Sequence, residues 1–164
     1  MNKNLDKYIE FHRENGGTGK LFNFKFLDYK EGCLELEGEF SESSLNPDGS
    51  VQGGMMTSML DDVTSLLIIF ETNGQIYPAS TDLHSLHHRP LSKGKIRAKA
   101  TIIKRGRNIA SIKGELIDKQ GRVATTLMHT AYLVQKPIKW KIYPLLIFIK
   151  AIIIFNFEWY QESN

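Results

Sequence analysis

The segment from Asn46 to Asp62, NPDGSVQGGMMTSMLDD, combines residue types that could act on a carbonyl group. Gly53 and Gly54 begin an apolar stretch that predicts a helix, and Asp61 follows two helical turns later. Glycine lets a backbone approach a ligand closely, and the first turn of a helix offers unpaired N–H groups with a partial positive charge. Such groups can stabilise a carbonyl oxygen under attack, and a carboxylate can act as base or nucleophile. The alternative is a glycine-rich helix start that binds nothing.

The helix predicted over 53–70 has two different faces on a wheel drawn at ~100° per residue. An apolar face, with Asp62 at its edge, would pack on a sheet: Val51, Met55, Met59, Leu60, Val63, Leu66, Leu67 and Phe70. The opposite face carries Asp61 with small or apolar residues: Thr57, Ser58, Thr64, Ser65 and Ile68. A solvated face normally carries Lys, Glu or Arg, so we expect a second subunit to cover this one and Asp61 to lie in a largely buried seam. Burial would make Asp61 a candidate base; the equal alternative is an exposed Asp61 that bonds a neighbouring Ser or Thr.

Further helix and strand patterns flank this segment. Helical spacing predicts a first helix over 5–14, which GGTG at 16–19 ends. Alternating residues predict strands over 21–28, where Phe22, Phe24 and Phe26 share a face, and over 33–40. Four more strands are predicted after the long helix, over 77–90, 94–105, 108–118 and 122–134. Strands joined by short turns pair antiparallel, and one sheet with one long helix is an α+β domain.

Composition limits the class of protein. The chain has 164 residues, of which 41% are hydrophobic and 24% charged, as in a globular domain with a real core. The net charge of +3 allows an anionic ligand, but no Lys/Arg run interleaves with aromatic residues as in nucleic-acid binding. The single cysteine, Cys33, excludes an internal disulfide and suits a reducing compartment. Because the first residues are too polar for a secretory signal, we expect a cytoplasmic protein.

The ordered motifs of residues 21–134 resemble the hotdog-fold acyl-CoA thioesterases, in the phenylacetyl-CoA thioesterase-like (PaaI-like) branch. That family has an Asn-x-x-Gly-x-x-His-Gly-Gly loop and an acid eight residues beyond the first glycine of the pair, matched here by Asn46, Gly49, Gly53, Gly54 and Asp61. A Ser/Thr-rich strand then ends in Arg-Pro-x-x-x-Gly, matched by Ser80, Thr81, Arg89, Pro90 and Gly94. The turns KRGRN and DKQG and the strand VATTLMHTAYLV follow in the family's order. Gln52 departs from the pattern, because it replaces the histidine before the glycines.

The resemblance implies a hotdog fold, an antiparallel sheet wrapped around a long central helix. It also implies hydrolysis of an acyl-CoA thioester to CoA and a carboxylic acid, without a cofactor. The active site would lie between the subunits of a homodimer, or of a homotetramer built from such dimers. Gly53 N–H would polarise the carbonyl, Asp61 would act as base or nucleophile, and Asn46 and Ser80 would position water or the thioester. The change at Gln52 leaves a non-catalytic acyl-CoA binding or sensing protein as the alternative.

Binding of CoA would require further contacts for its phosphates and adenine. Under the resemblance the substrate-binding residues are Gln52, Gly54, Arg89, Lys104, Arg105, Arg107 and Asn108. Arginine suits phosphate because its donors are paired in a fork. The alternative for this basic turn is a solvated surface loop.

The histidines of HSLHH predict no metal site. On a strand His84 and His88 share a face but stand ~13 Å apart, whereas His87 points the other way. His84 could line the acyl site, although an ordinary strand histidine is the simpler interpretation. Dehydration by a hotdog enzyme is the weaker enzymatic alternative, because its different loop pattern is absent from the sequence.

The predicted organisation has three parts: a helix and linker (1–20), a hotdog domain (21–135) and an apolar extension (136–164). The extension is strongly apolar over 142–155, but Pro144 and Lys150 interrupt it and it is short of the ~20 residues of a membrane span. Flanking lysines and aromatic residues suit peripheral membrane contact through 142–160. We favour the alternative, packing against the domain or a partner subunit.

Overall fold

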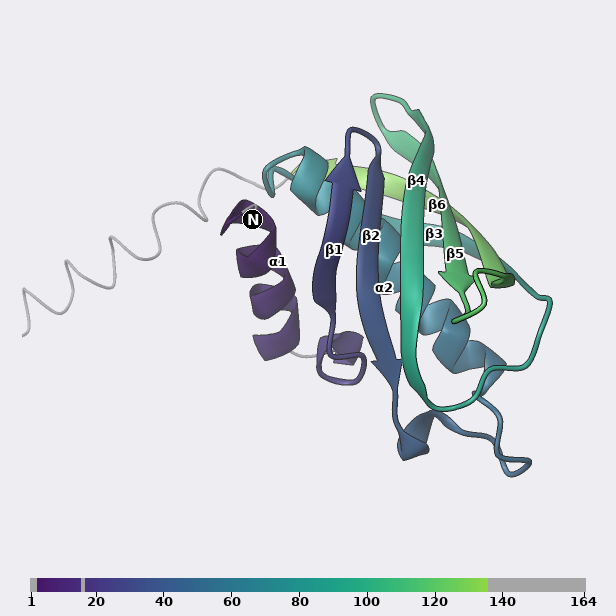
Figure 1. Ribbon diagram of the computed structural model, residues 1–164. Helices are drawn as coiled ribbons and strands as arrows, with labels where there is room; N and C mark the ends of the chain where they lie inside the picture. Colours follow the sequence, from purple (N-terminus) through teal and green to yellow (C-terminus); the bar gives the residue numbers. More distant parts are fainter. Residues whose placement is uncertain (1–2, 16, 136–164) are drawn as a thin grey trace, which may run out of the picture. The chain divides into compact units, whose positions relative to one another are not determined.

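A computed structural model describes residues 3–15 and 17–135 of the chain (Figure 1). The elements are α1 (Lys3–Glu14), η1 (Gly17–Lys20), β1 (Lys25–Lys30), β2 (Cys33–Phe40), η2 (Glu42–Ser44), α2 (Gly53–Glu71), β3 (Ile76–His87), β4 (Gly94–Arg105), β5 (Ile109–Ile117) and β6 (Val123–Gln135). The predicted order of a helix, two strands, a long helix and four strands is confirmed. All described residues except Gln135 belong to one compact unit, 1–134. The predicted extension, 136–164, lies outside the described residues.

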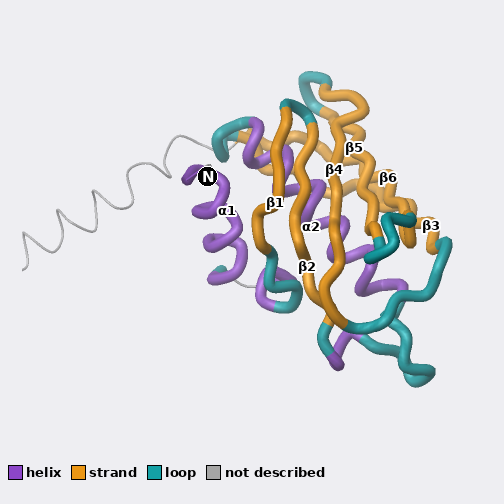
Figure 2. The backbone as a smooth tube through the Cα atoms, viewed as in Figure 1, coloured by secondary structure: helices purple, strands orange, loops and turns teal. Residues whose placement is uncertain are grey.

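The six strands form one sheet in the order β1-β2-β4-β5-β6-β3. The pairs β1–β2, β2–β4, β4–β5 and β5–β6 are antiparallel. Figures 1 and 2 show α2 lying along one face of the curved sheet, behind β1, β2 and β4 in this view. This is the predicted α+β arrangement of a sheet wrapped around a central helix, with β1 and β3 at the two edges.

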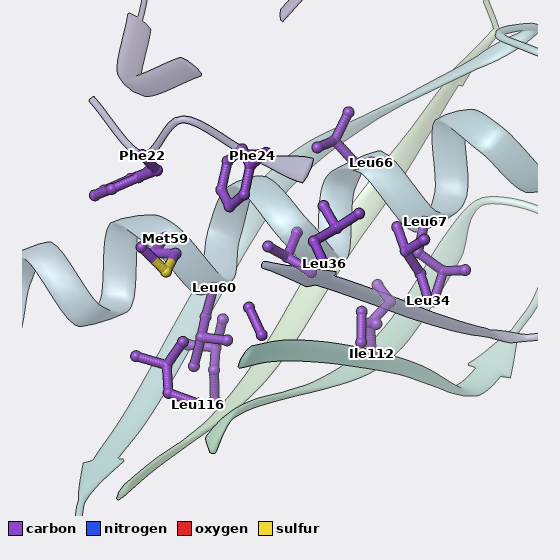
Figure 3. Close-up of a cluster of buried hydrophobic side chains, with 14 of the residues drawn as sticks. Phe22, Phe24, Leu34, Leu36, Met59, Leu60, Leu66, Leu67, Ile112 and Leu116 are labelled. Carbon is purple, nitrogen blue, oxygen red and sulfur yellow. The ribbon is translucent and has the colours of Figure 1, made fainter. Parts of the chain in front are cut away.

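The core lies between α2 and the sheet (Figure 3). Its largest fully buried side chains are Phe22, Phe24, Phe40, Leu34, Leu36, Met59, Leu60, Leu66, Leu67, Ile68 and Ile112. Glycine lets α2 approach the strands: a Cβ on Gly38 would stand 2.8 Å from the Met59 sulfur, and one on Gly114 would stand 3.2 Å from Leu60 Cδ2. Burial of apolar surface, at about 25 cal/mol per Å², therefore fixes α2 in one place on the sheet.

The first predicted strand, over 21–28, is wrong at its start. Asn23 has a φ of 45°, in the left-handed region, and β1 begins only at Lys25. Phe22 and Phe24 are nevertheless buried, with ring centroids 5.8 Å apart. The alternation of Phe residues was therefore a correct signal of burial but not of an extended strand.

The first helix is attached to α2 through Asp62. Thr18 Oγ1 donates a hydrogen bond of 2.5 Å to Asp62 Oδ2, and His12 Nε2 lies 3.3 Å from the same oxygen. This contact with Asp62 is the main cause that raises the pKa of His12 above 6.5. Asp62 is thus a buried structural carboxylate. Within the described part of the chain α2 alone is long and apolar enough for a membrane span, and it is the core helix.

Candidate active site

The start of α2 leaves two backbone donors available. Gln52 precedes the helix in an extended conformation and its side chain makes no capping hydrogen bond. Its carbonyl oxygen accepts from the N–H groups of Met55 and Met56, at 3.0 and 3.2 Å. Among the described residues we find no acceptor for the N–H groups of Gly53 or Gly54. At the positive end of a 19-residue helix, these two groups can donate to a ligand oxygen.

The loop before α2 is shaped by Asn46. Its Oδ1 accepts from the N–H groups of Asp48 and Ser50, at 3.1 and 3.0 Å, and its Nδ2 donates to Ser50 Oγ. Gly49 in the same loop has a φ of 81°, which favours glycine. The Val51 N–H then bonds the Leu91 oxygen at 2.8 Å and ties the loop to the segment after β3. Asn46 therefore has a loop-forming role that the sequence did not indicate.

Asp61 lies further along the same helix, beside β3. Ser80 Oγ donates to Asp61 Oδ1 at 2.8 Å, so the structure brings these two predicted residues together. One turn nearer the helix start, the hydroxyl groups of Thr57 and Ser85 are 2.7 Å apart. The Asp61 side chain is 32% exposed, so the expected largely buried seam is not present in the single chain.

A buried histidine that the sequence did not reveal stands next to Asp61. His129 of β6 is fully buried; its Nδ1 lies 2.8 Å from Thr64 Oγ1 and its Nε2 lies 3.8 Å from Asp61 Oδ1. Burial lowers the pKa of His129 below 6.5, against the opposing charges of Asp61 and Asp82. Its Nε2 makes no hydrogen bond within residues 3–15 and 17–135. The sequence signal that could have indicated this residue is the place of His129 among the inward-facing positions of β6.

The same contact corrects the prediction for the back of the helix. Thr64 and Ile68, expected to need cover from a second subunit, are fully buried within the chain. The chain's own strand β6 reaches that face, where His129 meets Thr64. Among the residues of that face, Thr57, Ser58, Asp61 and Ser65 stay partly exposed.

The basic turn predicted to bind CoA is not brought to Gly53 within one chain. Lys104, Arg105, Arg107 and Asn108 are exposed around the β4–β5 connection. Arg105 Nη1 lies 3.9 Å from Glu71 Oε2, at the last residue of α2. The two ends of this 19-residue helix are roughly 27 Å apart at 1.5 Å per residue, and Figure 1 shows the turn at the far end from the helix start. Arg89, by contrast, follows β3 near the Leu91–Val51 contact and is exposed.

The sequence comparisons identify the family. The model of the thioesterase superfamily matches residues 48–125. A putative thioesterase, a phenylacetic acid degradation-related protein from Ralstonia eutropha, is 30% identical, covers 76% of this chain and 98% of its own, and has a TM-score of 0.65. The chain belongs to the thioesterase superfamily. The chain described in this structure is also 28% identical to the proofreading thioesterase EntH from Klebsiella pneumoniae. The match spans 95 residues, 58% of this chain and 69% of EntH.

Solved structures agree on the fold of the thioesterase. A thioesterase from Haemophilus influenzae has a TM-score of 0.71 at 19% identity, over 80% of this chain and 90% of its own. The predictions of a hotdog fold, of PaaI-like relatives and of a thioesterase enzyme are confirmed. The roles of individual site residues stay predictions. Within the described ranges no group of three or more His, Cys, Asp and Glu side chains is arranged to hold a metal ion.

Proposed function

We propose that this thioesterase hydrolyses acyl-CoA thioesters, with Asp61 as the general base. The observation that carries the proposal is the arrangement around Asp61 on α2, a helix whose first N–H groups are free. Ser80 holds Asp61 Oδ1 at 2.8 Å, while the neutral His129 lies beside it. A structural neighbour from Streptococcus mutans, described as bound to acetyl CoA, supports CoA as the carrier; it has a TM-score of 0.63 at 16% identity, over 70% of this chain and 90% of its own.

The proposed reaction begins with the thioester carbonyl at the start of α2. The Gly53 N–H, followed by that of Gly54, donates to the carbonyl oxygen and stabilises the negative charge that develops there. Asp61 takes a proton from a water molecule as the water oxygen attacks the carbonyl carbon. The Ser80 hydroxyl occupies Oδ1, so Oδ2 is left to accept this proton. The tetrahedral intermediate then expels the CoA thiolate, which takes up a proton and leaves with the carboxylic acid.

This chemistry requires two copies of the chain. Asp61 is eight residues beyond Gly53 on one helix, which separates them by roughly 12 Å. Reacting atoms must approach to about 3–3.5 Å, so one carbonyl cannot be served by both residues of the same chain. We propose that Gly53 of one copy and Asp61 of another form each site. The basic turn at the β4–β5 connection would also need such a second copy to approach the substrate.

A thiol-trapping assay with short, medium, long and aromatic acyl-CoA esters tests the proposal. Thiol release with saturation kinetics from at least one ester is expected. The exchange of the family's histidine for Gln52 favours one alternative, a protein that binds acyl-CoA without turnover. Binding of acyl-CoA without thiol release would support that alternative. Hydrolysis of other thioesters but none of the CoA esters would show that CoA is the wrong carrier.

The cytoplasmic location and the role of residues 142–160 also stay proposals. We propose a cytoplasmic enzyme whose apolar extension serves packing, because the segment is short for a span. Co-sedimentation of the full chain with lipid vesicles would instead favour peripheral membrane contact.

A further inference from the structure

His87, the last residue of β3, places its imidazole ring against Gly53. A Cβ on Gly53 would stand 3.1 Å from His87 Nε2 and 3.3 Å from Cδ2, so the absence of a side chain makes room for the ring. His87 is exposed in the described chain. Its Nε2 therefore lies beside Gly53, the first residue of α2. The next residue, His88, turns the other way, and its Nε2 lies 3.0 Å from Thr126 Oγ1.

We assign the proton of His87 to Nδ1 from the contacts of two buried groups, Thr125 and Met56. The hydroxyl group of Thr125, which is fully buried, lies 3.2 Å from the Met56 sulfur, and we assign its single hydrogen to this contact. The Thr125 oxygen can then only accept, and His87 Nδ1 lies 3.3 Å from it. A neutral imidazole with hydrogen on Nδ1 has a lone pair on Nε2. With this assignment an acceptor stands beside Gly53, at the start of α2.

This pairing of donors and an acceptor matches the pantetheine end of a thioester substrate. The thioester oxygen accepts hydrogen bonds, and two CH₂ groups separate the thioester sulfur from an amide whose N–H donates one. We propose that His87 Nε2 accepts a hydrogen bond from this pantetheine amide, and that His87 thereby selects thioesters carried on pantetheine. The inference rests on the proposed hydrolysis at Gly53. It names the part of the substrate that is shared by CoA and by the phosphopantetheine of carrier proteins.

The test compares two small substrates with the same acyl group. One is the thioester of N-acetylcysteamine, which keeps the amide; the other is its analogue with an ester oxygen in place of the amide N–H. His87→Ala should lower kcat/KM for the amide substrate roughly fivefold, as expected for one hydrogen bond, and leave the ester analogue within about twofold. Equal losses for both substrates, or no loss for either, would overturn the proposal.

Two measurements separate this role from a structural one. His88→Ala, on the opposite face, should leave both substrates and the melting temperature nearly unchanged. Thr125→Val should reproduce part of the loss on the amide substrate but add nothing in a His87→Ala background, because it acts through His87. A preference that is independent of Thr125 would contradict the assigned tautomer and the proposal with it.

Acyl-CoA and acyl-carrier-protein esters then distinguish the two carriers. If His87 contacts only the shared amide, His87→Ala should lower kcat/KM about fivefold for the esters of both carriers. If the wild type releases thiol from no thioester, the proposed function fails, and calorimetric binding of a non-hydrolysable S-alkyl CoA tests the contact by itself. Weaker binding to His87→Ala than to wild type would support the contact, and equal binding would refute it.

Discussion

Asp61 and Asp62 show how one helix gives adjacent carboxylates different environments. Successive residues of a helix point about 100° apart, so Asp61 faces Ser80 on β3 while Asp62 faces Thr18 and His12. The Asp61 side chain is 32% exposed, whereas that of Asp62 is 10% exposed. The first can reach a substrate, and the second joins the N-terminal helix to the core.

The two carboxylates should therefore respond differently to substitution. Asp61→Ala should lower kcat by about 10²–10⁴, the usual contribution of a general base, while the melting temperature changes little. Asp62→Asn should keep kcat within a few-fold and lower the melting temperature, because the contacts of Thr18 and His12 weaken. Thiol release and thermal denaturation of both variants check this. Near-normal turnover by Asp61→Ala would refute its role as the base.

Two histidines should give the stability of the fold opposite pH dependences. The pKa of His12 is raised above 6.5, chiefly by its contact with Asp62, so protonation is favoured in the folded state. The contribution of His12 to the free energy of unfolding is complete below pH 6.5 and is lost as the pH rises through the raised pKa. Burial lowers the pKa of His129, so the folded state favours its neutral form. The contribution of His129 to the free energy of unfolding is present above pH 6.5 and is lost as the pH falls below 6.5.

Urea denaturation from pH 5 to pH 8 separates the two effects. His12→Gln should flatten the decline in the free energy of unfolding on the alkaline side, and His129→Gln should flatten the decline on the acidic side. The slopes with pH matter here rather than the absolute stabilities, because both substitutions also remove packing. Slopes equal to the wild type in either variant would show that the corresponding histidine is not the titrating group.

At the residue scale, local spacing predicted only part of the site. Gly53, Asp61 and Ser80 were identified from motifs, and the structure brings Ser80 to Asp61. His129 was missed because its proximity to Asp61 depends on β6 passing the back of α2, a contact between residues 68 positions apart. His87 was set aside for a similar reason: its partner Gly53 lies on another element, and a strand pattern does not show what its side chains meet.

At the scale of elements, hydrophobic periodicity was sufficient for the order of helices and strands. The ends that it missed depend on backbone dihedrals, as at Asn23, where a φ of 45° interrupts an alternating pattern of Phe residues. The distance between α2 and the sheet depends on two glycines, Gly38 and Gly114, which composition alone does not mark. Small residues under the helix thus set how closely α2 approaches β2 and β5.

Gly114 offers a direct test of this close approach. A Cβ there would stand 3.2 Å from both Leu60 Cδ2 and Thr64 Cγ2, which is tighter than ordinary contact. Gly114→Val should destabilise the protein by about 1–3 kcal/mol through overpacking, and Gly114→Ala by less. Strand propensity alone would make both substitutions stabilising, so the sign of the change in urea denaturation is decisive. An increase in stability would show that α2 can move away from β5 without cost.

For the whole molecule, the separation of Gly53 and Asp61 predicts an obligate assembly. The two residues lie roughly 12 Å apart along one helix, and β3 is an edge strand of the sheet. The protein should sediment as a dimer or a larger oligomer at micromolar concentration. A stable monomer with full activity would contradict the shared site.

Mixing two inactive variants tests the shared site itself. In Asp61→Ala every site lacks the proposed base, and in Gly53→Val every site lacks a fitting helix start, because the new side chain meets His87. If each site takes Gly53 from one copy and Asp61 from another, a mixed dimer has one site with both defects and one intact site. Equal amounts that are unfolded, mixed and refolded should then recover roughly a quarter of the wild-type rate, since half of randomly paired dimers are mixed. Each variant refolded alone provides the control. A mixture that stays inactive, although native mass spectrometry shows mixed dimers, would place the whole site within one chain.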